Sequence, residues 1–192
     1  MQIHSESSIH HPIDLVYNCY RDRLQQIAPY TPDIREIIVE SREEREQGPK
    51  IHNIWVADRD IPKVARGIIR PDMLQWDDYA DWNDAEQHVD WRLHIPAFPD
   101  AVQCSGRNAF FADGPTRTKV VLTGDLQINV KSVPGVPRIL AGRIAPKIEA
   151  FIVMLITQTL RRSTKAWSVF WMIRRHSSID FCVGAVHQLH QW

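Results

Sequence analysis

The sequence predicts one α+β domain in which a curved antiparallel β-sheet wraps around a long C-terminal α-helix, with short helices after the first strand. Two patterns predict it. Between residues 74 and 130, apolar and polar residues alternate with the period of a half-buried strand. After the segment Pro134–Pro137, apolar residues recur every three or four positions, which is the period of an amphipathic helix. The length of 192 residues suits a single domain over residues 1–171 with a C-terminal extension over 172–192, to which we assign no structure.

The first part of the chain is predicted to contain a strand, a helical segment and a hairpin. A strand over Gln2–His10 is followed by apolar residues spaced for one face of a helix over Ile13–Leu24. Two prolines then end the helical region. The segment Ile34–Val56 is strand-like on both sides of a Gly48-Pro49 turn, with a run of charged residues before the turn. This pattern predicts a hairpin with a solvated tip.

The rest of the predicted sheet and the last helix follow in order. Alternating segments predict strands over Leu74–Trp82, Val89–Ile95, Cys104–Phe110 and Val120–Val130. Each has one apolar face and one polar face, as an antiparallel sheet with one buried side requires. Helical spacing then predicts a long helix over Ile144–Trp171. Its apolar stripe needs a partner, and the apolar face of the sheet is the surface large enough to cover it.

The charged residues cancel overall but not locally. The chain has 23 Lys and Arg against 23 Asp and Glu. Residues 1–130 hold 14 basic and 21 acidic residues, a net charge of −7, whereas residues 131–192 hold 9 and 2, a net charge of +7. A dedicated nucleic-acid binder needs an excess of Lys and Arg, so we expect no nucleic-acid partner.

Other features bear on location and cofactors. Three widely spaced cysteines fit neither a disulfide framework nor a zinc cluster, and no export signal opens the chain, so we expect a cytoplasmic protein. The most apolar run, Ala150–Ile156, is too short to span a bilayer. His187 and His190 lack further metal ligands, and neither a Gly-rich phosphate loop nor a nucleophile elbow is present. We therefore expect no metal and no cofactor.

The order of elements and three local patterns carry a resemblance to a known family. They are the Pro-containing entry into the first helix over His11–Asp22, the late hairpin over Cys104–Val120, and Thr123–Leu126 leading through a Pro/Gly link into the last helix. In these features the chain resembles the START-like, or SRPBCC, superfamily of helix-grip folds, and in particular its uncharacterised bacterial members. The resemblance covers residues 1–171 and implies a cavity between the sheet and the C-terminal helix.

Residues on the inward face of the strands and helix are the candidate lining of that cavity. The predicted ligand-binding residues are Trp76, Asp78, Trp82, Trp91, Leu93, Asn108, Phe110, Leu122, Leu126, Phe151 and Leu155. Such a cavity is mostly apolar, with a few polar groups that orient the ligand; here Asp78 and Asn108 have that role, with Tyr17, Tyr20 or Tyr79 as further candidates. Two alternatives stay open: the side chains simply fill the core, or a one-residue shift places Asp78 on the outer face.

Two further groups of polar residues are expected at the surface. His52, His94 and Arg107 read as outward, and no spacing brings them together. The basic residues of the C-terminal region are Arg138, Arg143, Lys147, Arg161, Arg162, Lys165, Arg174 and Arg175. We interpret them as a polar helix face set against the acidic strands. The alternative is a transient contact of this basic face with an anionic membrane surface.

These observations predict a protein that binds, and by extension transports, a hydrophobic small molecule or lipid in the cavity, with no catalysis. The resemblance also implies an alternative, a polyketide cyclase or aromatase-like enzyme that uses the same cavity without a nucleotide cofactor. A third alternative is a protein-interaction module without a ligand. Two titratable groups inside the cavity would favour the enzyme, and a large exposed apolar patch without a cavity would favour the interaction module. The sequence leaves the ligand and the oligomeric state open.

Overall fold

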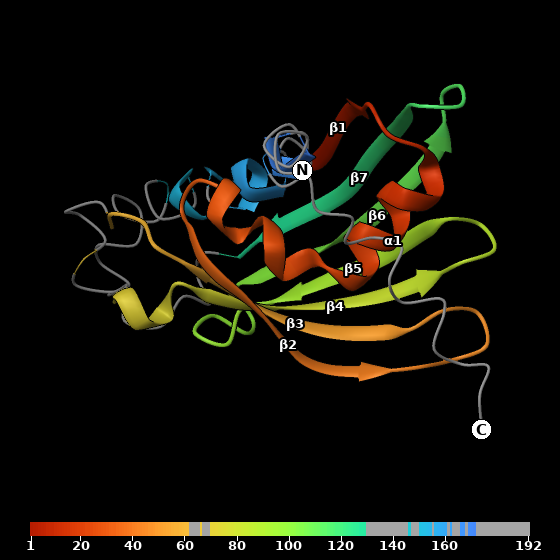
Figure 1. Cartoon of the computed structure of the whole chain (residues 1–192). Helices are drawn as coiled ribbons and strands as arrows, with labels where there is room; N and C mark the ends of the chain where they lie inside the picture. The colour runs from red at the N-terminus through yellow and green to blue at the C-terminus, as the bar shows by residue number, and fades with distance from the viewer. Residues whose placement is uncertain are drawn as a thin grey trace.

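A seven-stranded antiparallel sheet is the central element of the described part of the chain (Figure 1). The computed structural model describes residues 1–61, 66, 70–129, 146, 150–154, 156–160, 162, 166–167 and 169–171. The strands are β1 (Gln2–Ile9), β2 (Ile34–Glu43), β3 (Lys50–Ala57), β4 (Gln75–Asn83), β5 (His88–His94), β6 (Val102–Ala112) and β7 (Thr118–Ile128). Their order across the sheet is β1-β7-β6-β5-β4-β3-β2, so the long connection from β1 to β2 carries the chain from one edge of the sheet to the other.

That connection contains the two helical elements that follow the first strand. Helix α1 (Ile13–Asp22) begins directly after Pro12, whose fixed φ and missing N–H suit a helix start. Its buried side chains, Val16, Tyr17, Cys19 and Tyr20, share one face, which therefore packs against the sheet. The 3-10 helix η1 (Leu24–Tyr30) contains Pro29 and leads into β2, and a short 3-10 helix, η2 (Pro71–Met73), precedes β4.

The register of the strands sets which side chains share the inner face of the sheet. On β4 the burial pattern alternates, with Trp76, Asp78, Ala80 and Trp82 all buried on one face. Directly opposite residues in neighbouring strands point to the same side of a sheet. The pairing of Ala80 with Trp91 on β5 therefore extends this inner face across the next strand.

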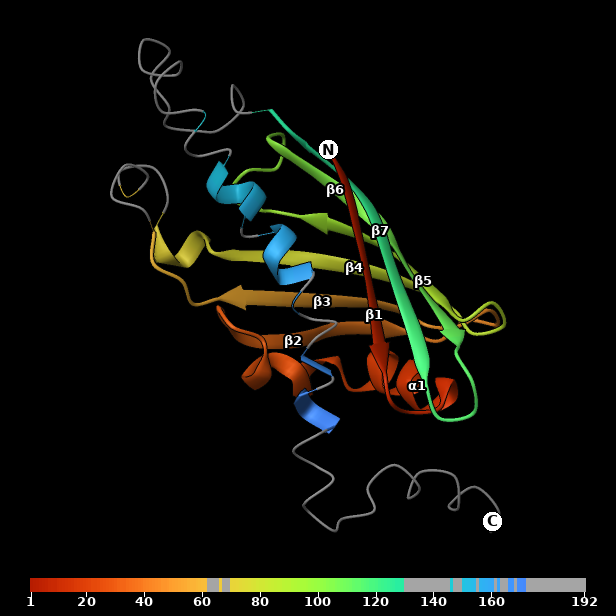
Figure 2. The same ribbon diagram turned by 90° about the horizontal axis from the view of Figure 1, so that it is seen from above.

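The described C-terminal residues lie over this inner face. Residues 150–154, 156–160 and 169–171 are helical, and their path crosses the strands on the same side as α1 (Figure 2). Phe151, Ile152 and Ile156 are buried in the core shared with the sheet. Further along, the Trp167 ring stacks on Tyr20 of α1, with 4.9 Å between ring centroids. The two helical segments thus pack on each other as well as on the sheet.

The predicted fold class is confirmed: a curved antiparallel sheet, short helices after the first strand and a helical C-terminal segment form an α+β structure. Residues 130–145 and 172–192 lie outside the described residues, and the first of these ranges includes Val130 at the end of the predicted last strand. Within the described ranges, none of the helices has the length and apolar composition needed to cross a bilayer.

Candidate functional site

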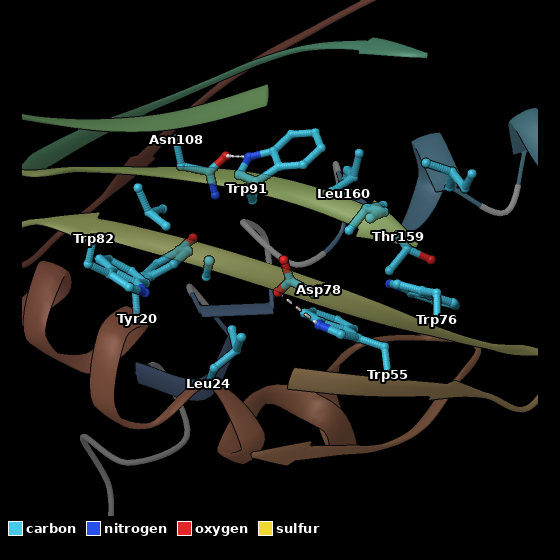
Figure 3. A pocket seen from close by; sticks show the side chains of 14 residues that line it. Tyr20, Leu24, Trp55, Trp76, Asp78, Trp82, Trp91, Asn108, Thr159 and Leu160 are labelled. Atoms are coloured by element: carbon cyan, nitrogen blue, oxygen red, sulfur yellow. Dashed lines mark hydrogen bonds between the residues drawn. The ribbon is translucent and has the colours of Figure 1, made fainter. Parts of the chain in front are cut away.

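A cavity lies between the inner face of the sheet and the helical segments, and indole rings dominate its lining (Figure 3). Its cavity volume is about 60 Å³, within a partly open hollow of about 660 Å³ that includes solvent space. The lining residues are Tyr20, Leu24, Trp55, Trp76, Asp78, Ala80, Trp82, Val89, Trp91, Leu93, Asn108, Ile156, Thr159 and Leu160. The sheet supplies nine of these residues, the connection from β1 to β2 supplies two, and the C-terminal segment closes the cavity with three.

Two glycines leave room for the indole ring of Trp91 against the sheet. Trp91 is paired with Gly106, which in turn is paired with Gly124 on the next strand. A Cβ at Gly106 would stand 2.4 Å from Trp91 Cζ2, and one at Gly124 would stand 2.8 Å from Trp91 Cη2. The ring therefore lies across both glycines at a distance that any other residue would prevent. In this position Trp91 Nε1 donates a hydrogen bond of 3.0 Å to Asn108 Oδ1.

Asp78 is the acidic side chain of the lining. It lies on the inner face of β4, is 8% exposed, and is paired with Asn53 of β3. Trp55 Nε1 and Asn53 Nδ2 both donate to its Oδ2, each at 3.3 Å. The other oxygen, Oδ1, points into the cavity (Figure 3). Burial raises the pKa of Asp78 from 3.8 to about 6, against the lowering effect of the two hydrogen bonds.

The structure brings six of the predicted ligand-binding residues together in this cavity and places the others elsewhere. Trp76, Asp78, Trp82, Trp91, Leu93 and Asn108 line it. Phe110, Leu122 and Leu126 are buried in the core of the sheet, outside the lining. Phe151 lines a smaller neighbouring cavity beside Trp76 and Ile152. Leu155 lies outside the described residues.

Of the three tyrosines considered for orienting a ligand, Tyr20 reaches the cavity. The Tyr17 hydroxyl instead donates a 2.9 Å hydrogen bond to Asp84, and this bond ties α1 to the β4–β5 turn. Tyr79 lies on the outer face of β4, where its ring stacks on His52 at 4.5 Å between centroids. Sequence reasoning missed Trp55, although Ile51, Asn53 and Trp55 alternate in the inward phase of β3; that alternation was the available signal.

On the outer face, the structure joins two histidines that no sequence spacing brings together. His52 Nε2 lies 2.9 Å from Asp77 Oδ1, and His94 Nδ1 lies 2.9 Å from Asp77 Oδ2. They meet because β4 lies between β3 and β5 in the sheet. Partial burial raises the pKa of Asp77, but the hydrogen bonds from His94 and His52 outweigh it and hold that pKa below its usual value. Arg107 pairs with Asp90 on the same face.

The five large hydrophobic residues that are exposed in the described part of the chain form no common patch. They are Met1, Ile38, Val39, Phe111 and Val169. Ile38 and Val39 lie on β2 and Phe111 lies on β6, with three strands between them. Single exposed apolar residues are normal on a protein surface.

Comparison with known proteins supports the fold class. No protein-family model and no curated protein matches the sequence. Among solved structures, a protein from Thermus thermophilus is 20% identical with a TM-score of 0.58, covering 86% of this chain and 96% of that one. The Zhui aromatase/cyclase from a Streptomyces species is 17% identical with a TM-score of 0.59, covering 94% and 99%. The two-domain aromatase/cyclase BexL is 14% identical with a TM-score of 0.56, covering 92% of this chain and 48% of that protein.

The sheet, the helical segments and the cavity between them define a class of α+β proteins built around an internal cavity. Within that class, the chain has a START/SRPBCC-like fold. At these identities the likeness establishes the fold, and function has to be argued from the cavity itself.

Proposed function

We propose that this protein binds a mostly apolar small molecule that contains a ring system, in the cavity between the inner face of the sheet and the C-terminal helical segment. One observation carries the proposal: four indole rings, those of Trp55, Trp76, Trp82 and Trp91, line a single cavity. Aromatic side chains offer large, rigid surfaces that stack on flat ligands, and burial of apolar ligand surface there supplies the affinity.

The polar groups of the lining support a ligand that also carries polar substituents. Asp78 Oδ1 and the Asn108 amide nitrogen have no hydrogen bond to another described residue. The indole N–H of Trp82, in addition, is fully buried and has no hydrogen-bond partner in the described ranges. An unpaired buried polar group costs about 1–3 kcal/mol, which a hydrogen bond from a ligand would offset.

A cavity-filling substitution tests this proposal. Ala80 is the small residue between Asp78 and Trp82 on the inner face of β4, so Ala80→Phe introduces a ring into the cavity. The matched control is Ala112→Phe at an exposed position on β6. We expect the wild type and Ala112→Phe to bind the neutral fluorophore Nile red, and Ala80→Phe to lose it. Native mass spectrometry of the same three purified proteins would detect a retained molecule, which we expect in the wild type and Ala112→Phe but not in Ala80→Phe. Equal Nile red binding by Ala80→Phe, or none by the wild type, would overturn the proposal.

A second candidate function is catalysis, which the position of Asp78 favours. A buried carboxylate with a pKa of about 6 is suited to move a proton near neutral pH. Asp78 would accept a proton from a carbon beside a ligand carbonyl. The resulting enolate would attack a second carbonyl of the same chain, and the new alkoxide would take the proton back from Asp78. No co-reactant is needed, and the protein ends as it began.

The catalytic alternative has its own test. The diketone heptane-2,6-dione cyclises by this route to a six-membered ring. The cyclic product can be measured by gas chromatography. Catalysis predicts a rate above that in buffer, which is lost in Asp78→Asn and kept in Asp90→Asn, a change at an outer-face carboxylate. A rate no higher than in buffer, or one unchanged in Asp78→Asn, would leave binding as the function.

A further inference from the structure

The apolar lining does not indicate the charge of the ligand, but the groups around Asp78 do. Trp55 Nε1 and Asn53 Nδ2 occupy Oδ2 and leave Oδ1 facing the cavity. Both donors are neutral, so they satisfy hydrogen bonding without cancelling the charge. Among the described lining residues there is no Lys, Arg or His. Burial of a carboxylate without a cationic partner costs desolvation free energy. Because Asp78 is already buried in the folded protein, this desolvation takes place on folding and not on ligand binding.

The rings beside Asp78 are also suited to a cation. Trp55 and Trp76 are direct cross-strand neighbours, and their rings are nearly parallel, at 14° and 6.0 Å between centroids. The Trp55 N–H is already committed to Asp78, so these indoles offer a ligand apolar surface and π electrons. The indole face attracts ammonium groups more strongly than other aromatic rings do. An acidic group and two indoles at one end of a cavity together form a recognition site for an organic cation.

We propose that the ligand carries a protonated amine, which binds Asp78 Oδ1 beside Trp55 and Trp76 while its ring system lies over Trp91. This inference rests on the proposed binding function and adds the chemical class of the ligand. It disfavours fatty acids and other anionic amphiphiles, because their head group would meet the Asp78 carboxylate with no compensating cation among the described lining residues.

The position of Asn108 extends this picture to the other end of the ligand. Asp78 is paired with Leu93 and Asn108 with Val89, so the two polar residues are separated by four residues along β5, about 13 Å at the usual rise per residue. Trp91 lies between them on the same strand. The Asn108 oxygen accepts from Trp91, which leaves its NH₂ group to donate to the ligand. A ligand that spans the cavity therefore carries an amine at one end and a hydrogen-bond acceptor at the other.

Three probes that share one ring system and differ in charge test the proposal. Isothermal titration calorimetry near neutral pH compares naphthylethylamine, naphthylethanol and naphthylacetate, all with the same ring attachment. We expect the amine to bind at least about tenfold more tightly than the alcohol, and the acid to bind most weakly. Asp78→Asn should remove the preference for the amine and leave the alcohol within about threefold. Asp90→Asn, on the outer face, should change neither.

The outcomes separate this inference from the function on which it rests. The amine inference is overturned if the amine binds no better than the alcohol, or if the preference for the amine survives in Asp78→Asn. In either case, loss of binding of all three probes in Ala80→Phe would still support the cavity as the binding site. Tightest binding by the acid overturns it as well. If no probe binds and Nile red is not bound either, the binding function itself fails. The charge preference of the wild type is decisive even if Asp78→Asn does not fold.

Discussion

Replacement of Asp78 by asparagine should stabilise the protein above neutral pH, although it removes a charge from a hydrogen-bonded site. The Asn side chain keeps an oxygen for the bonds from Trp55 and Asn53 and has no charge to desolvate. Burial raises the pKa of Asp78 from 3.8 to about 6. At about 1.4 kcal/mol per pKa unit, ionisation of Asp78 costs the folded state roughly 3 kcal/mol.

The pH dependence follows from the sign of this shift. Because the folded-state pKa is the higher one, the folded protein holds the proton more tightly than the unfolded chain does. The contribution of Asp78 to stability is therefore fully present below about pH 4 and is lost as the pH rises through about 6. The variant lacks this loss. Its free energy of unfolding should exceed that of the wild type by a margin that grows between these two pH values.

Urea denaturation of both proteins across this pH range measures the margin directly. Other titrating groups are common to the two proteins, so they cancel in the difference between the free energies of unfolding. We expect the difference to increase by about 2–3 kcal/mol from pH 4 to pH 7 and then to level off. A difference that is constant with pH would show that folding does not change the pKa of Asp78. A difference that falls as the pH rises would show that folding lowers this pKa.

Three further changes have outcomes set by the described contacts. Gly106→Ala places a Cβ 2.2 Å from the Thr123 carbonyl oxygen and should destabilise by several kcal/mol in urea denaturation; Gly114→Ala, in open space at φ 88°, should cost only about 1–2 kcal/mol. Asp33→Asn keeps the left-handed backbone and removes the ion pair with Arg162, so it should cost about 1 kcal/mol and speed hydrogen exchange in residues 150–160. Asp77→Asn should destabilise the protein at neutral pH, and its difference from the wild type should shrink as the pH falls below the ordinary range of an aspartate, because the folded-state pKa is lowered.

Each of these outcomes has a clear opposite. Equal stability of the two glycine variants would mean that Gly106 is not needed for the approach of neighbouring atoms. Unchanged exchange in residues 150–160 would mean that Asp33 does not hold the helical segment. An Asp77→Asn difference that grows on acidification would contradict the lowered pKa, whereas adjacent Asp77 and Asp78 with opposite pH dependences would support their placement on opposite faces of β4.

The alternation of the strands was sufficient to predict the inner face, because a period of two fixes the side on which a residue lies wherever no bulge intervenes. Asp78 is the informative case. Its phase predicted an inward carboxylate, a bulge was the alternative, and the pairing of Asp78 with Leu93 and Asn53 is continuous through this region. The residues that line the cavity were harder to predict, because inward direction alone does not separate lining from core. Phe110 and Leu122 have the same phase as Asn108 but are covered by neighbouring side chains.

Contacts between strands that are distant in sequence could not be predicted at all from spacing. His52 and His94 meet on Asp77 because β3, β4 and β5 are consecutive in the sheet and in that particular register. A one-residue change in either pairing would move a histidine to the other face. The same reasoning applies to the Trp91 ring over Gly106 and Gly124, since the sequence shows two glycines in strands but not the indole that they admit.

The opposite charges of the two parts of the chain predict an attraction between sheet and helix, and the described contacts give it a specific place. Several ion pairs of the sheet region join neighbouring strands, as with Arg107 of β6 and Asp90 of β5. The described helical segment meets the sheet side at Asp33, whose Oδ2 lies 2.9 Å from Arg162 Nη1 and 3.2 Å from Arg59 Nη1. Arg59 in turn contacts Gln158 of the same segment. Residues 158 and 162 are one helical turn apart and thus share one face of this segment, whereas Ile156, Thr159 and Leu160 line the cavity. One helical segment therefore both closes the cavity and carries the ionic contact, so a ligand that displaces the segment must also strain the bonds to Asp33.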